Sequence, residues 1–292
     1  MPTDSILRYR ETFFSENAEL SKEVALSQKE MSKLCDNASA KIYRSVQKAR
    51  NSPDYSTSVG QSKLLSDVDG ILREFKADSF ILLCRCLNEA AYIALNRSES
   101  DFKAIRIDFD PLTEAKVSKL VSGLIERSKP YITIQALRMF QCVKQATKKE
   151  AIEISRLSSI ENVSRAEATK LLFVKNSKNE IQLNYLNKSG HAWSAGNYLG
   201  LVIVAAITHA ENDIYVESAI SNGHDVAIVS KRESSIKSKW PGKIISLTGS
   251  DKTIGSLASV FDEGKIFHPR SKHSLLVYSE VADEFLKEPY AV

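Results

Sequence analysis

The sequence predicts no membrane-spanning helix. The longest strongly apolar stretch, Leu199–Ile207, has nine residues, whereas a membrane-spanning helix needs about 20. The first residues include Asp4, Arg8 and Arg10, and they lack the apolar core and small-residue cleavage site of a secretory signal. We therefore expect no membrane span and a cytoplasmic location.

Cysteine and histidine are scarce, and neither forms a recognisable site. The close pair Cys84 and Cys86 does not have the C-x-x-C spacing of zinc and redox sites, and the five histidines are not spaced as metal ligands. The Gly-x-Ser-x-Gly, His-Glu-x-x-His and P-loop signatures are absent. The sequence predicts no metal site and no cofactor. It favours a protein that is not an enzyme, although a catalytic constellation assembled by the fold stays open.

Glycine is rare in the first 189 residues, where only Gly60, Gly70 and Gly123 occur, whereas the last 103 residues hold eight. Because glycine marks turns and helix ends, this change predicts long helices first and short alternating elements afterwards. The predicted fold class is α+β with several domains. These are a helical N-terminal bundle over 1–130, a central winged-helix-like module over 131–190, and a small α/β domain over 191–292.

The two flanking parts carry ordinary folding patterns. Apolar residues recur at helical spacing from Ser5 to Gln47, and Phe80–Leu95 is apolar almost all round, which is typical of the buried helix of a bundle. The segment 104–109 alternates like a strand, with an extended linker as the alternative. In the last domain, short β-branched segments alternate with helical ones, which predicts a partly parallel sheet.

Basic charge is concentrated in the middle of the chain. Lys and Arg exceed Asp and Glu by one in 1–130 and by five in 131–190, whereas acidic residues exceed basic ones by two in 191–292. A local basic excess is expected of a module that contacts nucleic acid, because phosphate neutralisation supplies much of the binding energy. An evenly solvated polar face is the alternative reading.

The middle segment has the order of elements of a winged helix. We predict helices over 134–145, 148–157 and 163–172, then two extended runs, 171–175 and 180–186, joined by polar turn-forming residues. The sequence Tyr-Leu-Asn-Lys-Ser-Gly of 185–190 resembles the Tyr-x-Leu-Thr-x-x-Gly sequence that closes the wing in winged-helix DNA-binding domains. The resemblance covers about 60 residues and implies nucleic-acid binding, with DNA favoured over RNA.

In the winged-helix reading, the third helix enters the major groove. Ser164, Arg165 and Thr169 are then expected to face bases or phosphates, and Arg165 is the principal candidate. Lysines are expected to contact phosphates as flexible point charges; they are Lys148, Lys149, Lys170, Lys175 and Lys178. Alternatively, the same face of such a module contacts another protein.

A second candidate site lies in the last domain, because ligands of open α/β sheets bind beyond the carboxyl ends of strands. This points to Ser230 and to the turn of Gly249, Ser250 and Asp251, where a helix N-terminus could hold an anion. The plainer reading is that Ser250 or Asp251 is a helix N-cap.

The sequence therefore leaves three functions open. The first is a protein that binds nucleic acid, with DNA favoured over RNA, and whose flanking domains form a homo-oligomer or sense a ligand. The second is a self-assembling, nucleocapsid-like protein that packages nucleic acid. The third is a small-molecule sensor or enzyme that uses the last domain.

Overall fold

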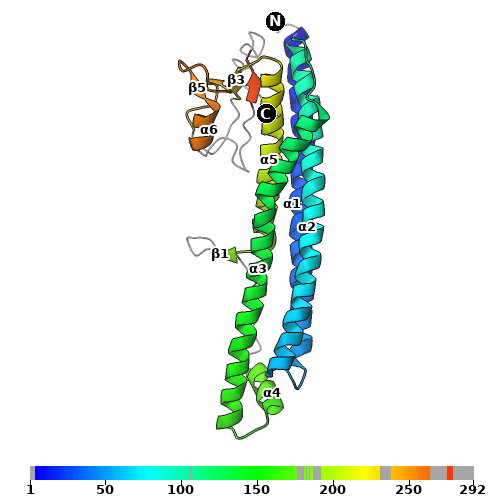
Figure 1. Cartoon of the computed structure of the whole chain (residues 1–292), viewed down its shortest axis with the longest axis vertical. Helices are drawn as coiled ribbons and strands as arrows, with labels where there is room; N and C mark the ends of the chain where they lie inside the picture. Colours follow the sequence, from blue (N-terminus) through cyan, green and yellow to red (C-terminus); the bar gives the residue numbers. More distant parts are fainter. Residues whose placement is uncertain are drawn as a thin grey trace. The chain divides into compact units, whose positions relative to one another are not determined.

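The computed structural model describes residues 4–105, 107–175, 181, 183, 185–186, 192–230, 238–263 and 275–278. Side chains are described from residue 20 onward, except at residues 175, 185, 186, 192 and 193. Three helices of 47 residues each, α1 (Asp4–Arg50), α2 (Ser58–Ala104) and α3 (Glu114–Ile160), make up most of this part (Figure 1). The prediction of a mainly helical N-terminal part is confirmed.

Three shorter helices follow: α4 (Arg165–Lys175), α5 (Ala195–Ser221) and α6 (Leu257–Glu263). The strands are β1 (Tyr185–Leu186), β2 (Ala192–Trp193), β3 (Val226–Val229), β4 (Ile244–Ser246), β5 (Gly255–Ser256) and β6 (Leu275–Val277). The described residues of 104–109 form no strand, so the linker alternative fits them. There α2 ends at Ala104, and Ile105, Ile107 and Phe109 pack as a non-regular segment against the core of the sheet.

The chain forms two compact units, each assembled from separated segments. Unit 1 consists of Met1–Ser27, Leu83–Ser128 and Leu201–Val292, and unit 2 consists of Gln28–Leu82 and Lys129–Gly200. The predicted domain limit at residue 130 falls inside α3.

Unit 1 contains a four-stranded sheet with the order β5-β4-β3-β6. Neighbouring strands are antiparallel except for β4 and β5, which are parallel, so the sheet is mixed. Its core gathers the buried strand residues with Phe102 from α2, Tyr215 from α5 and Val260 from α6. The predicted small sheet near the C-terminus is therefore present.

A buried charge cluster joins α2, α5 and β6 in unit 1. The guanidinium of Arg97 bonds to the Glu211 carboxylate, donates to the carbonyl of Leu275 at 2.6 Å, and lies 4.5 Å over the centroid of the Tyr215 ring. Burial and the neighbouring Asp101 raise the pKa of Tyr215 well above its ordinary value. Because a buried charge is tolerated only when paired and hydrogen-bonded, this cluster fixes how the helices meet the sheet.

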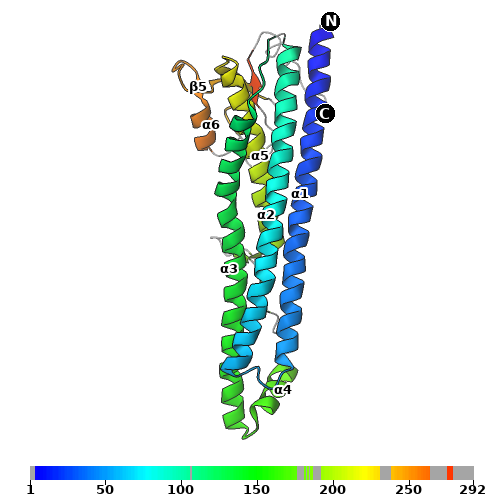
Figure 2. The same ribbon diagram turned by 45° about the vertical axis from the view of Figure 1, so that its right-hand side comes forward.

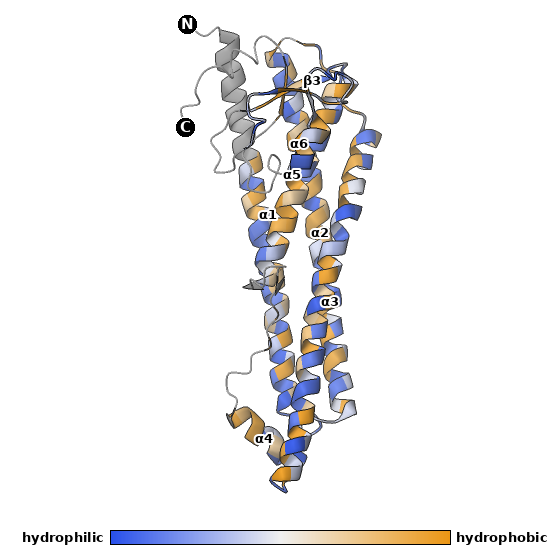
Figure 3. Cartoon of the chain, turned by 90° about the vertical axis from the view of Figure 1, so that its left-hand side faces the viewer, coloured by the Kyte–Doolittle hydropathy of each residue, from blue (hydrophilic) through white to orange (hydrophobic). Residues whose placement is uncertain are grey.

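Among the described helices, α5 alone is long and apolar enough to span a membrane by length and composition, and orange residues dominate it in Figure 3. Of its most apolar window, 61% is buried inside the protein. It also buries polar side chains, including Glu211 and Asn212. These features fit the core helix of a folded domain.

In unit 2, α1 and α2 lie side by side in both views (Figures 1 and 2), and Lys41 and Glu74 form an ion pair between them at 2.7 Å. The start of α5 packs on α1 through two glycines one helical turn apart. A Cβ at Gly196 would lie 3.1 Å from the Ser32 carbonyl oxygen, and one at Gly200 would lie 2.9 Å from Gln28 Cγ. Ser32 Oγ donates a hydrogen bond to the Gly196 carbonyl at 3.2 Å. Because glycine has no side chain, α5 can approach α1 this closely.

Replacing Gly196 by valine is expected to lower the thermal stability of unit 2. The added side chain meets the backbone of Ser32, and overpacking of this kind costs about 1–3 kcal/mol. The matched control is Gly70→Ala, since no atom lies within 4 Å of a Cβ at Gly70 in α2. That change should stabilise the helix by up to about 1 kcal/mol. Thermal unfolding followed by circular dichroism measures both, and equal shifts would contradict the packing argument.

Candidate nucleic-acid interface

The two units carry opposite net charge. Unit 2 contains 20 Lys and Arg against 12 Asp and Glu, a formal charge of +8, whereas unit 1 contains 20 against 24, a formal charge of −4. Unit 2 therefore has a larger basic excess than the continuous segment 131–190, in which Lys and Arg exceed Asp and Glu by five. Fields of this size attract polyanions and repel other cations.

The strongest basic surface in unit 2 lies on α3. From residue 127 to residue 149 the chain has no Asp or Glu, and Arg138, Lys144, Lys148 and Lys149 are exposed on this helix. The next carboxylate, Glu150, is buried and bonded to Arg50. This part of α3 therefore contributes no exposed carboxylate of its own.

A four-residue turn, 161–164, joins α3 to α4. Asn162 adopts a left-handed conformation with φ of 50°, which ends the helix. The amide of Val163 donates to the Ser158 carbonyl at 3.2 Å, and Ser158 Oγ donates to the Val163 carbonyl at 2.6 Å. Helix-turn-helix units are built with connections of this length.

A capping box begins α4. The Ser164 hydroxyl accepts a hydrogen bond from the Glu167 amide at 3.2 Å, and the Glu167 carboxylate accepts from the Ser164 amide at 3.0 Å. The Ser164 hydroxyl also donates to this carboxylate, and these bonds lower the pKa of Glu167. Two amides that a helix start leaves without partners are thereby satisfied, which fixes where α4 begins.

A buried ion pair holds α4 against the rest of unit 2. Arg50, the last residue of α1, bonds to Glu150 of α3 through both Nε and Nη2, and Tyr55 donates its hydroxyl proton to the same carboxylate. The Arg50 guanidinium also lies 4.6 Å over the centroid of the Phe173 ring in α4. Burial would lower the pKa of Arg50, but bonding to Glu150 raises it above its ordinary value.

Some of the predicted contact residues have exposed side chains, whereas the hydroxyls of others are hydrogen-bonded within the protein. Lys148, Lys149, Arg165 and Lys170 are exposed. Ser164 is exposed, but its hydroxyl serves the capping box. Thr169 is only 6% exposed, and its hydroxyl donates to the Arg165 carbonyl at 2.7 Å, so its predicted contact with bases or phosphates does not fit this position.

The two remaining predicted lysines are not described in side-chain detail. Lys175 is the last residue of α4, and only its backbone is described. Lys178 lies outside the described residues.

The secondary structure of this region differs from the winged-helix expectation at two places. The helices predicted over 134–145 and 148–157 are one continuous part of α3, because the residues between them contain no helix breaker. The segment 171–175 is helical rather than extended, since Ala168 and Leu172 face the core four residues apart. Two helices joined by a short turn remain, and the winged-helix module stays a prediction.

A short antiparallel hairpin contains the sequence that carries the winged-helix resemblance. In it, β1 pairs with β2, with Tyr185 opposite Trp193, and the connecting residues 187–191 lie outside the described part of the chain. Nearby, the Tyr43 hydroxyl donates to the Ile181 carbonyl at 2.6 Å, so this segment contacts α1. The observed hairpin thus comes later in the chain than the predicted one.

Sequence reasoning missed Arg138 and Lys144 as parts of the basic surface. The available signal was the absence of acidic residues from 127 to 149, because a gap of this length on a helix leaves consecutive turns with basic charge only. It also missed the buried Arg50, Tyr55 and Glu150 cluster. These residues are up to 100 positions apart, and no local pattern connects them.

The second predicted site, at 249–251, is filled by the protein's own carboxylate. Asp225 accepts hydrogen bonds from Ser246 Oγ, Ser250 Oγ and the Thr248 amide, each at 2.7 Å. Burial alone would raise the pKa of Asp225, but bonds from Thr248, Ser246 and Ser250 hold it below its ordinary value. The loop therefore already holds an anion.

The other residues of this predicted site are also engaged. The Gly249 amide donates to Ser246 Oγ at 2.8 Å, with a positive φ of 74° at this glycine. The Asp251 carboxylate accepts from the Thr253 amide at 2.8 Å, and the helix that follows this turn, α6, begins only at Leu257. Ser230, at the end of β3, is buried. The expected helix N-terminus with outward amides does not occur here.

Comparison of the chain with protein-family models, with curated proteins and with solved structures gives no match.

Changing Glu150 to alanine is expected to destabilise unit 2 strongly. The change leaves the buried Arg50 guanidinium without its carboxylate, and breaking one side of a buried ion pair costs about 3–5 kcal/mol. The control is Glu153→Ala, three residues away on α3, whose Arg156 partner is exposed. Thermal unfolding should shift greatly for the first change and little for the second; similar shifts would refute the anchoring role.

Changing Asp225 to alanine is expected to destabilise unit 1 at neutral pH, because three donors lose their acceptor. Since the folded pKa of Asp225 is lowered, its stabilisation is present above the ordinary aspartate pKa of about 3.9 and is lost as the pH falls through that value towards the folded one. The Tm difference between wild type and variant should therefore shrink on acidification. Asp262→Ala, at an exposed position on α6, is the control and should leave the Tm close to that of wild type.

Proposed function

We propose that the protein binds nucleic acid through unit 2, with DNA as the favoured form. The observation that carries the proposal is the charge of +8 on unit 2, together with a 23-residue stretch of α3 that contains no acidic residue. Each phosphate contact releases condensed counterions from the nucleic acid, and this release supplies sequence-independent affinity. Exposed side chains on α3 and α4 are the contacting groups.

The two kinds of basic residue take different roles in this proposal. Lys144, Lys148 and Lys149 of α3 neutralise phosphates as flexible point charges. Arg165 stands in the first turn of α4, where the recognition helix of a helix-turn-helix presents side chains to base edges. Its planar guanidinium can bond to two acceptors of guanine at once, which lysine cannot do.

The buried anchor supports the same assignment. A helix that reads a groove must be held rigidly, and α4 is held by its capping box at one end and by the Phe173 contact with Arg50 near the other. The engaged hydroxyls of Ser164 and Thr169 restrict the proposed contacts of α4 to Arg165 and Lys170. The proposal therefore assigns fewer contacts than the sequence pattern alone.

The test is a salt series with the full-length protein and the triple variant Lys148→Ala, Lys149→Ala, Arg165→Ala. Wild type should bind duplex oligonucleotides with a steep dependence on salt. The slope of log affinity against log salt should fall by about 0.9 for each phosphate contact that the variant loses. Fluorescence anisotropy measures both affinity and slope.

The matched control removes three exposed lysines from unit 1: Lys103→Ala, Lys119→Ala, Lys252→Ala. It alters the net charge by the same amount but leaves unit 2 intact. Its affinity and slope should stay close to those of wild type. Equal losses in the two variants would mean that only total charge matters, and absence of binding at low salt would refute the proposed function.

Competition separates a regulator from a packaging protein. If Arg165 reads base edges, one duplex sequence competes better than others, and Arg165→Lys removes this preference while keeping most of the affinity. If all sequences and RNA compete equally, the nucleocapsid-like alternative is favoured. In that alternative, the lysines of α3 neutralise phosphates, and no side chain needs to contact base edges in a groove.

A further inference from the structure

A cavity of about 550 Å³ lies in unit 1 beside the parallel strands β4 and β5. Residues 239–240, 242–244 and 254–255 form its wall, which is apolar apart from two lysines. Its volume is within the range of sites for small organic molecules, about 300–1,000 Å³. Neither Ser230 nor the turn 249–251 lines it, so it is distinct from the ligand site predicted from the sequence.

A rigid turn shapes one side of this cavity. The amide of Lys243 donates to the Trp240 carbonyl at 2.8 Å, and Pro241 and Gly242 occupy the two central positions. Proline restricts φ at the first of these, and Gly242 has the positive φ of 75° that a type II turn requires at the second. The Gly242 amide also donates to the carbonyl of Val229 in β3 at 2.7 Å. A ligand therefore meets an ordered wall and spends little free energy on shaping it.

The indole of Trp240 forms part of the wall and has an unused hydrogen-bond donor. Trp240 is 8% exposed and lies directly on the backbone of β5, since a Cβ at Gly255 would overlap its ring. Its Nε1 is buried and has no hydrogen-bond partner among the described residues. Buried indole N–H groups usually have an acceptor. This donor therefore points to an acceptor that the described part of the chain does not supply.

The charged side chains of the wall have a single sign. Lys239 and Lys243 are exposed, and neither forms an ion pair in the part of the chain that the structure describes. The Lys239 ammonium lies 4.8 Å from the centroid of the Trp240 ring. The Glu263 carboxylate accepts from the nearby Ser238 hydroxyl at 2.8 Å but does not line the cavity. The wall therefore favours an anion.

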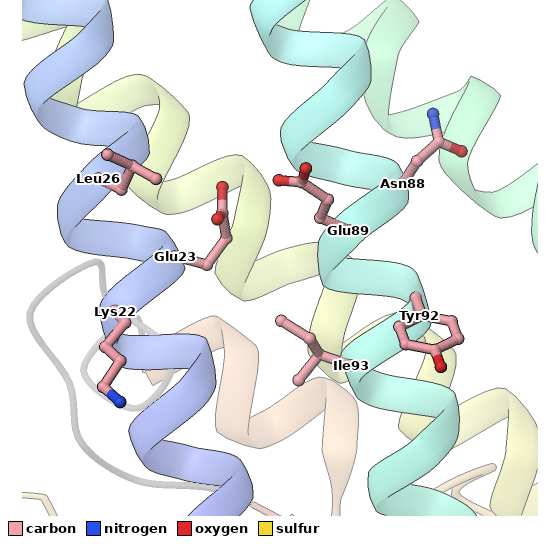
Figure 4. Close-up of a pocket in the computed structure, with 7 residues that line it drawn as sticks. All are labelled: Lys22, Glu23, Leu26, Asn88, Glu89, Tyr92 and Ile93. Atoms are coloured by element: carbon pink, nitrogen blue, oxygen red, sulfur yellow. The ribbon is translucent and has the colours of Figure 1, made fainter.

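The groove between α1 and α2 in unit 1 has no such preference. Figure 4 shows this groove, with Lys22 and Glu23 on α1 and Glu89 on α2. Arg85, on the same helix as Glu89, lies 3.7 Å from its carboxylate. Because charges of both signs surround this groove, they select no class of ligand.

We propose that the cavity beside β4 and β5 binds a small organic anion with an apolar body, such as a medium-chain carboxylate. The apolar body packs against Ile244, Ile254 and the Trp240 ring. The carboxylate accepts charge-assisted hydrogen bonds from Lys239 and Lys243, and it supplies the acceptor that the Trp240 N–H lacks. This inference does not depend on nucleic-acid binding, which is assigned to unit 2.

Titration with decanoate tests the site through the fluorescence of Trp240. The chain has two tryptophans, so Trp193→Phe in the full-length protein leaves Trp240 as the only one. Decanoate should change this fluorescence and saturate at one site per chain. Decanol and decylammonium have the same chain length without the negative charge and should bind about tenfold more weakly or worse. An unchanged fluorescence with decanoate, or equal binding of the three compounds, would overturn the proposal.

A double variant tests the two lysines. Lys239→Gln with Lys243→Gln should weaken decanoate binding about tenfold in isothermal titration calorimetry. Both positions are exposed, so circular dichroism and the Tm should stay close to those of wild type. The matched control is Lys103→Gln with Lys119→Gln, which removes two exposed lysines of unit 1 outside the cavity and should keep the affinity. Equal affinities of the two double variants would contradict the assigned role of the lysines.

Discussion

The buried carboxylate of Glu150 is the constraint on which unit 2 depends. It receives Arg50 from the end of α1 and Tyr55 from the turn before α2, and the same guanidinium lies over Phe173 of α4. Tyr55 and Phe173 also meet edge to face, with 6.0 Å between ring centroids. An isolated buried charge costs several kcal/mol, which is comparable to the net free energy of unfolding of a small domain. Four elements must therefore meet at this point together.

This ion pair also determines the charge that unit 2 presents to solvent. Because Arg50 and Glu150 neutralise each other inside the protein, the first carboxylate after residue 127 contributes nothing to the exposed face of α3. From Arg127 to Lys149, the exposed charged residues of this helix are therefore all basic. A surface glutamate at the same position would weaken phosphate binding by direct repulsion. The packing of the unit and its proposed binding surface are thus linked through one residue.

The sequence predicted the parts of the fold that depend on local pattern. Long helices followed from apolar spacing and the scarcity of glycine, and the C-terminal sheet followed from its β-branched segments. The apolar run 171–175 was misread, because four or five apolar residues fit a strand and a buried helix equally well. The predicted helix break after residue 145 had no glycine or proline to support it. The anchors of the site arise from contacts between residues 95 to 100 positions apart, which local pattern does not contain.

The opposite charges of the two units bear on the proposed function. Unit 1 carries −4 and repels a polyanion, whereas unit 2 carries +8 and attracts one. The formal charge of the whole chain is only +4, so the net charge understates the positive charge gathered in unit 2. Phosphate neutralisation depends on the local density of basic side chains, and this density is set by the fold rather than by the overall composition.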